Sequence, residues 1–114
     1  MNSSRWIILK HLVQKHHHYD LLIEKNDICR TWKLRDLPLV DGPSVPIQLS
    51  TNHRLYWLEI SEGHVSRDRG SVKRIDAGIY TDELPKDETA PVLVTLQGQK
   101  ITARLEIAFN LCRF

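Results

Sequence analysis

The stretch His18-Tyr19-Asp20-Leu21-Leu22-Ile23-Glu24 alternates between two kinds of side chain, and this alternation indicates the fold class. Successive side chains of an extended strand point to opposite faces. One face of the stretch carries Tyr19, Leu21 and Ile23, and the other carries His18, Asp20, Leu22 and Glu24. We therefore predict a strand that packs one apolar face on a core and holds a histidine and a carboxylate on the other.

The rest of the chain is divided into short apolar or β-branched segments by turn residues, such as the Asn26-Asp27 pair and a Pro- and Gly-containing loop at 38–46. We expect strands at residues 5–11, 19–24, 28–34, 47–50, 71–75, 79–80, 92–96 and 100–107, with 55–60 as a strand or an irregular bend. Residues 76–78 are expected to form a turn, and 82–91 a polar, acidic connector. Residues 1–114 are thus predicted to form one all-β domain, a barrel or a sandwich, with short or no helices.

Composition is that of an ordinary globular chain, with 114 residues, 41% hydrophobic and 26% charged. The net charge of +2 is too small to indicate nucleic-acid binding by itself. The apolar run Trp6–Leu9 is far too short for a signal peptide or a membrane span. We expect a cytoplasmic monomer without membrane contact, in which Cys29 and Cys112 are buried, reduced thiols rather than zinc ligands, with a disulfide between them as the open alternative.

A candidate metal site follows from the polar face of the quoted stretch. His18 and Asp20 point the same way, and His11 lies one short strand upstream. Two imidazoles and one carboxylate form a facial set of ligands that suits a divalent metal and leaves open positions for a substrate. Two alternatives stay open, namely a solvated surface strand without function and an iron-oxygenase-like triad of His18, Asp20 and His53.

Several motifs occur in an order and spacing that carry a family resemblance. They are Arg5–His11, His18-Tyr19-Asp20 with Glu24, Thr31-Trp32, His53-Arg54-Leu55, Glu62-Gly63, Gly70-Ser71-Val72 with Asp76 and Gly78, and Leu96–Lys100. Together they resemble the 3′-phosphoesterase domain of bacterial DNA ligase D and the small stand-alone proteins related to it. The resemblance covers nearly the whole chain.

The resemblance implies a compact β-barrel that uses manganese to remove a 3′-phosphate or a terminal 3′-ribonucleotide from nucleic acid during break repair. It implies that His11, His18 and Asp20 bind the metal. His53 would contact the scissile phosphate, as a hydrogen-bond donor or general acid. The expected partners are the 3′ ends of DNA or of DNA–RNA primer-templates, together with a separate ligase or polymerase.

Further residues receive roles as expectations. Trp57 stands where the family has a tyrosine, with Tyr56 just before it, and both are candidates for substrate contact. Arg69 and Arg74 belong to a basic cluster that could contact a phosphate backbone. Glu24 could orient a ligand histidine by hydrogen bonding. His16 and His17 are expected in a loop without function.

Two positions depart from the family pattern. Leu22 stands where the family places an arginine, and Asp36 where a lysine is expected. A metal site without its arginine loses stabilisation of transition-state charge. Restoring the arginine at position 22 would then strengthen phosphate binding. The same departures favour the second candidate function, a non-catalytic barrel that binds metal or nucleic acid.

Overall fold

The computed structural model describes residues 4–64 and 70–114, which form nine strands and one short 3₁₀ helix. In chain order they are β1 (Arg5–Val13), β2 (His16–Lys25), β3 (Ile28–Leu34), β4 (Val45–Arg54), η1 (Leu55–Glu59), β5 (Glu62–His64), β6 (Ser71–Thr81), β7 (Val92–Gly98), β8 (Thr102–Ala108) and β9 (Leu111–Arg113).

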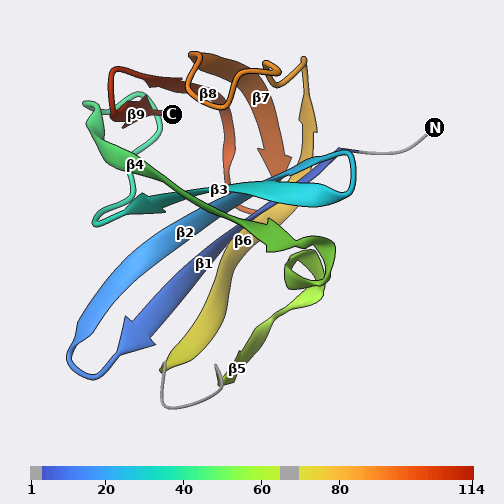
Figure 1. Ribbon diagram of the computed structural model, residues 1–114. Coiled ribbons are helices and arrows are strands. Elements are labelled where there is room, and N and C mark those ends of the chain that lie inside the picture. Colours follow the sequence, from blue (N-terminus) through green and yellow to red (C-terminus); the bar gives the residue numbers. More distant parts are fainter. Residues whose placement is uncertain (1–3, 65–69) are drawn as a thin grey trace.

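The strands form a closed antiparallel barrel, which confirms the predicted all-β fold (Figure 1). Eight strands follow one another in the order β1-β2-β3-β4-β9-β8-β7-β6, and β6 also pairs with β1, so the sheet closes on itself. The ninth strand, β5, pairs with β6 outside this closed set. Closure pairs the edges that an open sheet would leave exposed.

The barrel interior holds the main core. Tyr19, Leu21 and Ile23 all pack in or against it, as the alternation of β2 predicts. Its buried members come from both halves of the chain and include Trp6, Ile8, Leu21, Ile23, Trp32, Leu34, Ile47, Tyr80, Leu84, Leu96, Leu105, Ile107 and Phe114. Because side chains alternate along each strand, the neighbouring residues of β1, β2 and β3 must lie on the outer face of the barrel.

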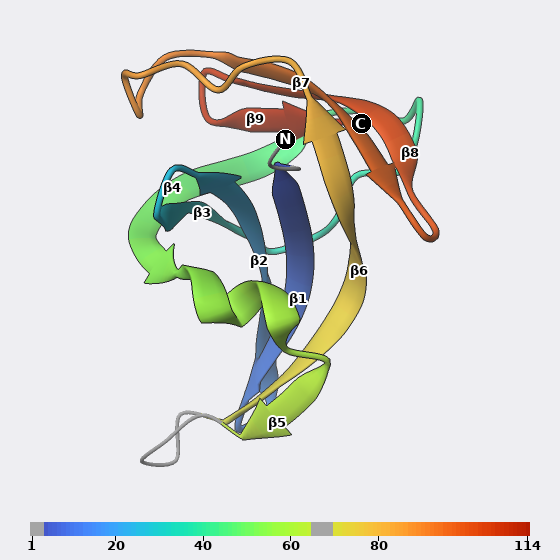
Figure 2. The same cartoon turned by 90° about the vertical axis from the view of Figure 1, so that its right-hand side faces the viewer.

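A second, smaller apolar cluster lies on that outer face, where η1 covers β1 and β2 (Figure 2). Leu58 of η1 packs with Ile7, Leu9, Leu22 and Cys29, and all five are buried. The segment 55–60 was expected as a strand or an irregular bend, and this prediction is wrong. Its apolar residues reach the outer face by winding into a helical turn.

The turn expected at 76–78 is also absent, because β6 runs through these residues to Thr81. The backbone of Ala77 and Gly78 pairs with β1, and a register shift between Ile8 and Leu9 accommodates one extra residue on β6. The Asp76 side chain does not form a local turn. It is buried and accepts backbone N–H bonds from residues 99–101, at the tip of the β7–β8 hairpin.

Smaller differences from the sequence prediction occur at the start of β2 and near the end of the chain. β2 begins at His16, so His16 and His17 are exposed strand residues and not loop residues. The strand β9 was not predicted. Cys29 and Cys112 are buried free thiols, as expected. Among the described residues, no helix is long and apolar enough to cross a membrane.

Candidate metal centre

The first hairpin brings the predicted metal ligands together. His11 of β1 and His18 of β2 are direct cross-strand partners, and Asp20 pairs with Leu9, two residues further along. Directly opposite residues of an antiparallel pair have side chains on the same face, as do residues two apart. His11, His18 and Asp20 therefore share the outer face of the barrel, beyond the cluster covered by η1.

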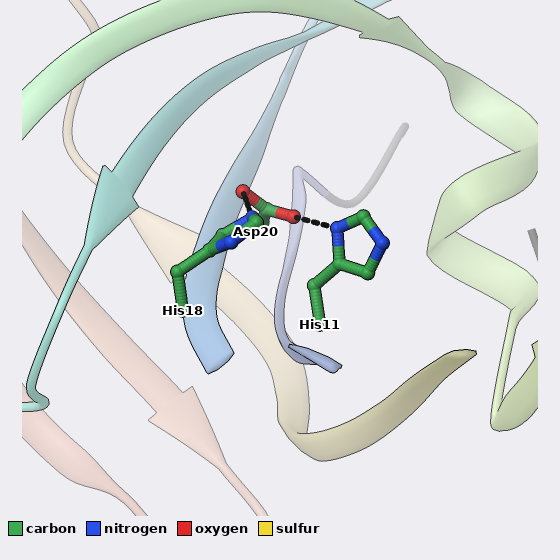
Figure 3. Close-up of side chains that lie close together, drawn as sticks. All are labelled: His11, His18 and Asp20. Atoms are coloured by element: carbon green, nitrogen blue, oxygen red, sulfur yellow. Dashed lines mark ion pairs between the residues drawn. The ribbon is translucent and has the colours of Figure 1, made fainter. Parts of the chain in front are cut away.

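The three side chains converge on one point (Figure 3). Their possible ligand atoms all lie within 4.8 Å of one another. Asp20 lies between the imidazoles: its Oδ1 is 3.3 Å from His18 Nε2, and its Oδ2 is 3.9 Å from His11 Nδ1. The rings of His11 and His18 meet edge to face, with centroids 4.8 Å apart.

Two of these ligand atoms are buried without a hydrogen-bond partner. His18 Nε2 and Asp20 Oδ1 are close enough for charge attraction, but they do not have the geometry of a hydrogen bond. A buried polar group left unsatisfied costs on the order of 1–3 kcal/mol. A cation bound between the two atoms would satisfy both, so the pair favours an ion site over a purely structural contact.

The electrostatics of His18 also suit metal binding. Burial is the largest cause of a lowered pKa at His18, opposed by the Asp20 carboxylate and reinforced by His11 and Lys33. A lowered pKa keeps the imidazole neutral at neutral pH, and metal ions bind the neutral form. Two nitrogen donors and one carboxylate oxygen suit several first-row divalent metals. The donor set does not by itself distinguish manganese from the others.

His53 lies on the same outer face but does not join the converging group. A register shift in the β3–β4 pairing leaves Ser50 opposite Thr31 and His53 opposite Cys29, so both β4 residues face the same way. Among the described residues, the group of converging donors contains His11 and not His53. The iron-oxygenase-like triad of His18, Asp20 and His53 is therefore not assembled here.

The His53 ring is held in one orientation by hydrogen bonds. Its Nδ1 lies 3.0 Å from the Thr51 carbonyl oxygen and 2.9 Å from Thr31 Oγ1. Because a carbonyl can only accept, Nδ1 carries the proton and donates. The buried Thr31 hydroxyl then donates to the Cys29 carbonyl at 3.3 Å. This network leaves His53 Nε2 as the nitrogen available to a substrate.

Of the two aromatic candidates, Trp57 contacts His53 and Tyr56 contacts Trp57. Trp57 meets the His53 ring edge to face at a centroid distance of 5.5 Å, and it also packs against the η1 cluster. Tyr56 lies beside Trp57 and is exposed. The structure thus places both near His53, and their contact with a substrate stays a prediction.

Glu24 and Arg74 interact with residues outside the metal group. The Glu24 carboxylate accepts a hydrogen bond from the Arg5 backbone N–H and lies 3.8 Å from Arg5 Nε, four residues along β2 from Asp20. Arg74 donates to the carbonyls of Ile60 and Leu58, which anchors the end of η1. Arg69 lies outside the described residues. The predicted roles of all three stay untested.

Leu22 explains how the face differs from the family pattern. It lies on the same face as His18 and Asp20, but it is 0% exposed beneath Leu58 of η1. The position that carries an arginine in the family here belongs to an apolar cluster. A guanidinium at this position would have no open route to a metal-bound phosphate.

Two residues of the site were missed by sequence reasoning. Thr31 was noted only as part of a motif, yet it positions His53. Lys33 is the cross-strand partner of Asp20 and is exposed on the same face. Counting outward from a two-residue turn at Asn26-Asp27 would have placed Lys33 opposite Asp20.

By its geometry, the protein is a small β-barrel with a candidate metal centre on its outer face, formed by two histidines and one carboxylate. A scan against protein families finds no match for the chain, and a search of curated proteins finds no significant match.

Proposed function

We propose that the protein is a metal-dependent phosphoesterase that processes the 3′ ends of nucleic acid, removing a 3′-phosphate or a terminal 3′-ribonucleotide. The observation that carries the proposal is the convergence of His11, His18 and Asp20, with two buried ligand atoms that lack hydrogen-bond partners. The family resemblance supplies the substrate class and the choice of manganese.

Each residue of the face has a separate task in this proposal. His11, His18 and Asp20 hold the ion, which when bound polarises a phosphoryl oxygen. His53, held through Nδ1, directs Nε2 toward the phosphoester. When protonated, Nε2–H can donate to the phosphoryl oxygens or to the departing 3′ oxygen. Water attacks phosphorus, the P–O3′ bond breaks, and a 3′-hydroxyl and inorganic phosphate are released from a 3′-phosphate end.

The test is an end-processing assay on two primer-templates, one ending in a 3′-phosphate and one in a 3′-ribonucleotide. We expect conversion to 3′-hydroxyl ends with manganese, loss of conversion with a chelator, and loss in Asp20→Ala. Glu106→Ala, which removes an exposed carboxylate paired with Arg113 on another part of the barrel, is the matched control. A wild type that leaves both ends intact at every divalent metal tested contradicts the proposal.

One observation favours the second candidate, a non-catalytic barrel that binds metal or nucleic acid. Leu22 is buried in an apolar cluster, so no cation occupies the position of the family's arginine. Manganese and oligonucleotide binding without any turnover would identify this second function.

A further inference from the structure

A hollow of about 640 Å³ lies directly beside the candidate metal centre. His18 lines it, so the metal group and the hollow share a wall. Residues 46–49 of β4, the strand paired with β3, also line it, and their apolar members include Ile47 and Leu49. The polar lining residues are two histidines, two amides and the cations Lys33 and Arg35, and no carboxylate lines the hollow.

The two cations of this hollow differ from three arginines elsewhere on the described surface. Arg5, Arg104 and Arg113 each form an ion pair with a carboxylate. Among the described residues, no ion pair or side-chain hydrogen bond involves Lys33 or Arg35. The lining of the hollow therefore carries cations and no carboxylate, and such a site attracts an anion.

The order of the two cations along the chain gives the anion a direction. Lys33 is the cross-strand partner of Asp20, so its side chain starts beside the metal group. Arg35 follows two residues later, in the bend after β3, and lines the same hollow.

We propose that this hollow binds the nucleic-acid strand upstream of the reacting 3′ end, with Lys33 on the terminal phosphate and Arg35 on the next phosphate in the 5′ direction. The inference rests on the proposed function, which it deepens. Leu22 is uncharged and buried, so its position on β2 offers no cation to a phosphate. Lys33 supplies a cation from the neighbouring strand β3. Exposed Leu49 offers an apolar surface to the face of a base, and Gln48 and Asn110 offer amides to its edge.

The proposal predicts a dependence on strand length as well as on charge. The test measures binding of a fluorescent, 3′-phosphorylated six-nucleotide DNA by anisotropy, in chelator so that no turnover occurs. We expect Lys33→Ala and Arg35→Ala each to weaken binding at least threefold, and the double variant at least tenfold. The slope of log Kobs against log salt concentration should be smaller in magnitude by about 1.4 in the double variant than in wild type. Two phosphate contacts are lost, and each contributes about 0.7 to this slope.

Matched controls separate this site from general charge. Arg104→Ala and Arg113→Ala remove the same charge from paired positions elsewhere, and we expect less than a twofold change. A 3′-phosphorylated mononucleotide should bind weakly and should respond to Lys33→Ala but not to Arg35→Ala. Equal losses in the controls, or wild-type binding by the double variant, would overturn the inference.

The strand-binding test and the end-processing assay can fail independently of each other. Binding in chelator does not require the metal, so Asp20→Ala should still bind the six-nucleotide strand. If the double variant binds normally while wild-type protein processes 3′ ends, the inference fails and the proposed function stands. If strand binding follows the expected pattern without any turnover, the inference stands and the protein is the non-catalytic barrel.

Discussion

The outer face holds two separate groups of histidines, and the proposed function gives each group a different role that single substitutions can test. His11 and His18 converge on Asp20, whereas His53 is held by Thr31 and Thr51 on a different strand. A ligand histidine and a phosphate-contacting histidine should therefore affect different measurements, namely metal affinity and turnover.

We expect His53→Ala to keep manganese affinity near that of wild type while turnover falls by about 10²–10⁴-fold, the usual contribution of general acid–base catalysis. Calorimetry measures the first quantity and the end-processing assay the second. His53→Gln keeps one donor but cannot supply a titrating proton. It should recover part of the rate if charge stabilisation dominates, and little if proton transfer does. Loss of metal binding in His53→Ala would return His53 to the metal ligands and remove His11.

The sequence predicts the position of His18 relative to Asp20, but not the hydrogen bond between Thr31 and His53. The pairing of His18 with Asp20 follows from a two-residue period, and the structure confirms that they share a face with His11. The side of β4 that faces this group depends on the register shift opposite Arg30, which no local pattern reveals. The Thr31–His53 hydrogen bond depends on that shift, so it could not be anticipated.

At the scale of elements, η1 decides which parts of the outer face are open. Its Leu58 covers Leu22, so the cluster beneath behaves as a small second core. The sequence showed an apolar segment at 55–60, but not that it would pack on the outside of the barrel. Helix and strand patterns are hard to distinguish in segments this short.

We expect Leu22→Arg to lower the free energy of unfolding by on the order of 3–5 kcal/mol, because it places an unpaired charge among buried apolar side chains. Leu22→Met conserves volume and should cost less than about 1.5 kcal/mol. Urea denaturation followed by tryptophan fluorescence measures both. An arginine variant that is as stable as wild type and binds phosphate more tightly would show that the family's phosphate geometry is accessible after all.

The two cysteines test burial in the two apolar regions independently. Burial raises the pKa of Cys29, in the outer cluster, to about 11, and that of Cys112, in the barrel core, to about 12. Thiolates are the reactive form, so at pH 8 both groups should stay protonated and unreactive in the folded protein. Ellman's reagent should detect neither thiol in native protein and both in guanidinium chloride. Rapid reaction of a native thiol at pH 8 would contradict the packing described for its cluster.

At the scale of the whole molecule, Asp76 links barrel closure to the β7–β8 hairpin. Its carboxylate accepts N–H bonds from Ala77, Gln99, Lys100 and Ile101 at 2.7–3.0 Å. Gly98 makes room for this arrangement, since a Cβ there would lie 2.4 Å from Asp76 Oδ2. A sequence pattern of Asp-Ala-Gly indicates a turn locally, and only the closed sheet assigns the aspartate to a distant hairpin.

We therefore expect Asp76→Ala to cost on the order of 3–5 kcal/mol of unfolding free energy, because four partly buried N–H bonds lose their charged acceptor. Glu106→Gln, which removes an exposed ion pair with Arg113, is the control and should cost less than about 1 kcal/mol. Chemical denaturation compares the two. Equal, small losses would mean that the hairpin closes the barrel without this carboxylate.

The central claim is that His11, His18 and Asp20 form one divalent metal site, and calorimetric titration with manganese tests it most directly. We predict one site per chain in wild type, and binding weakened at least tenfold in His18→Ala. His17→Ala, the adjacent exposed histidine, should bind manganese as wild type does. Equal manganese affinity in wild type and His18→Ala would contradict the account.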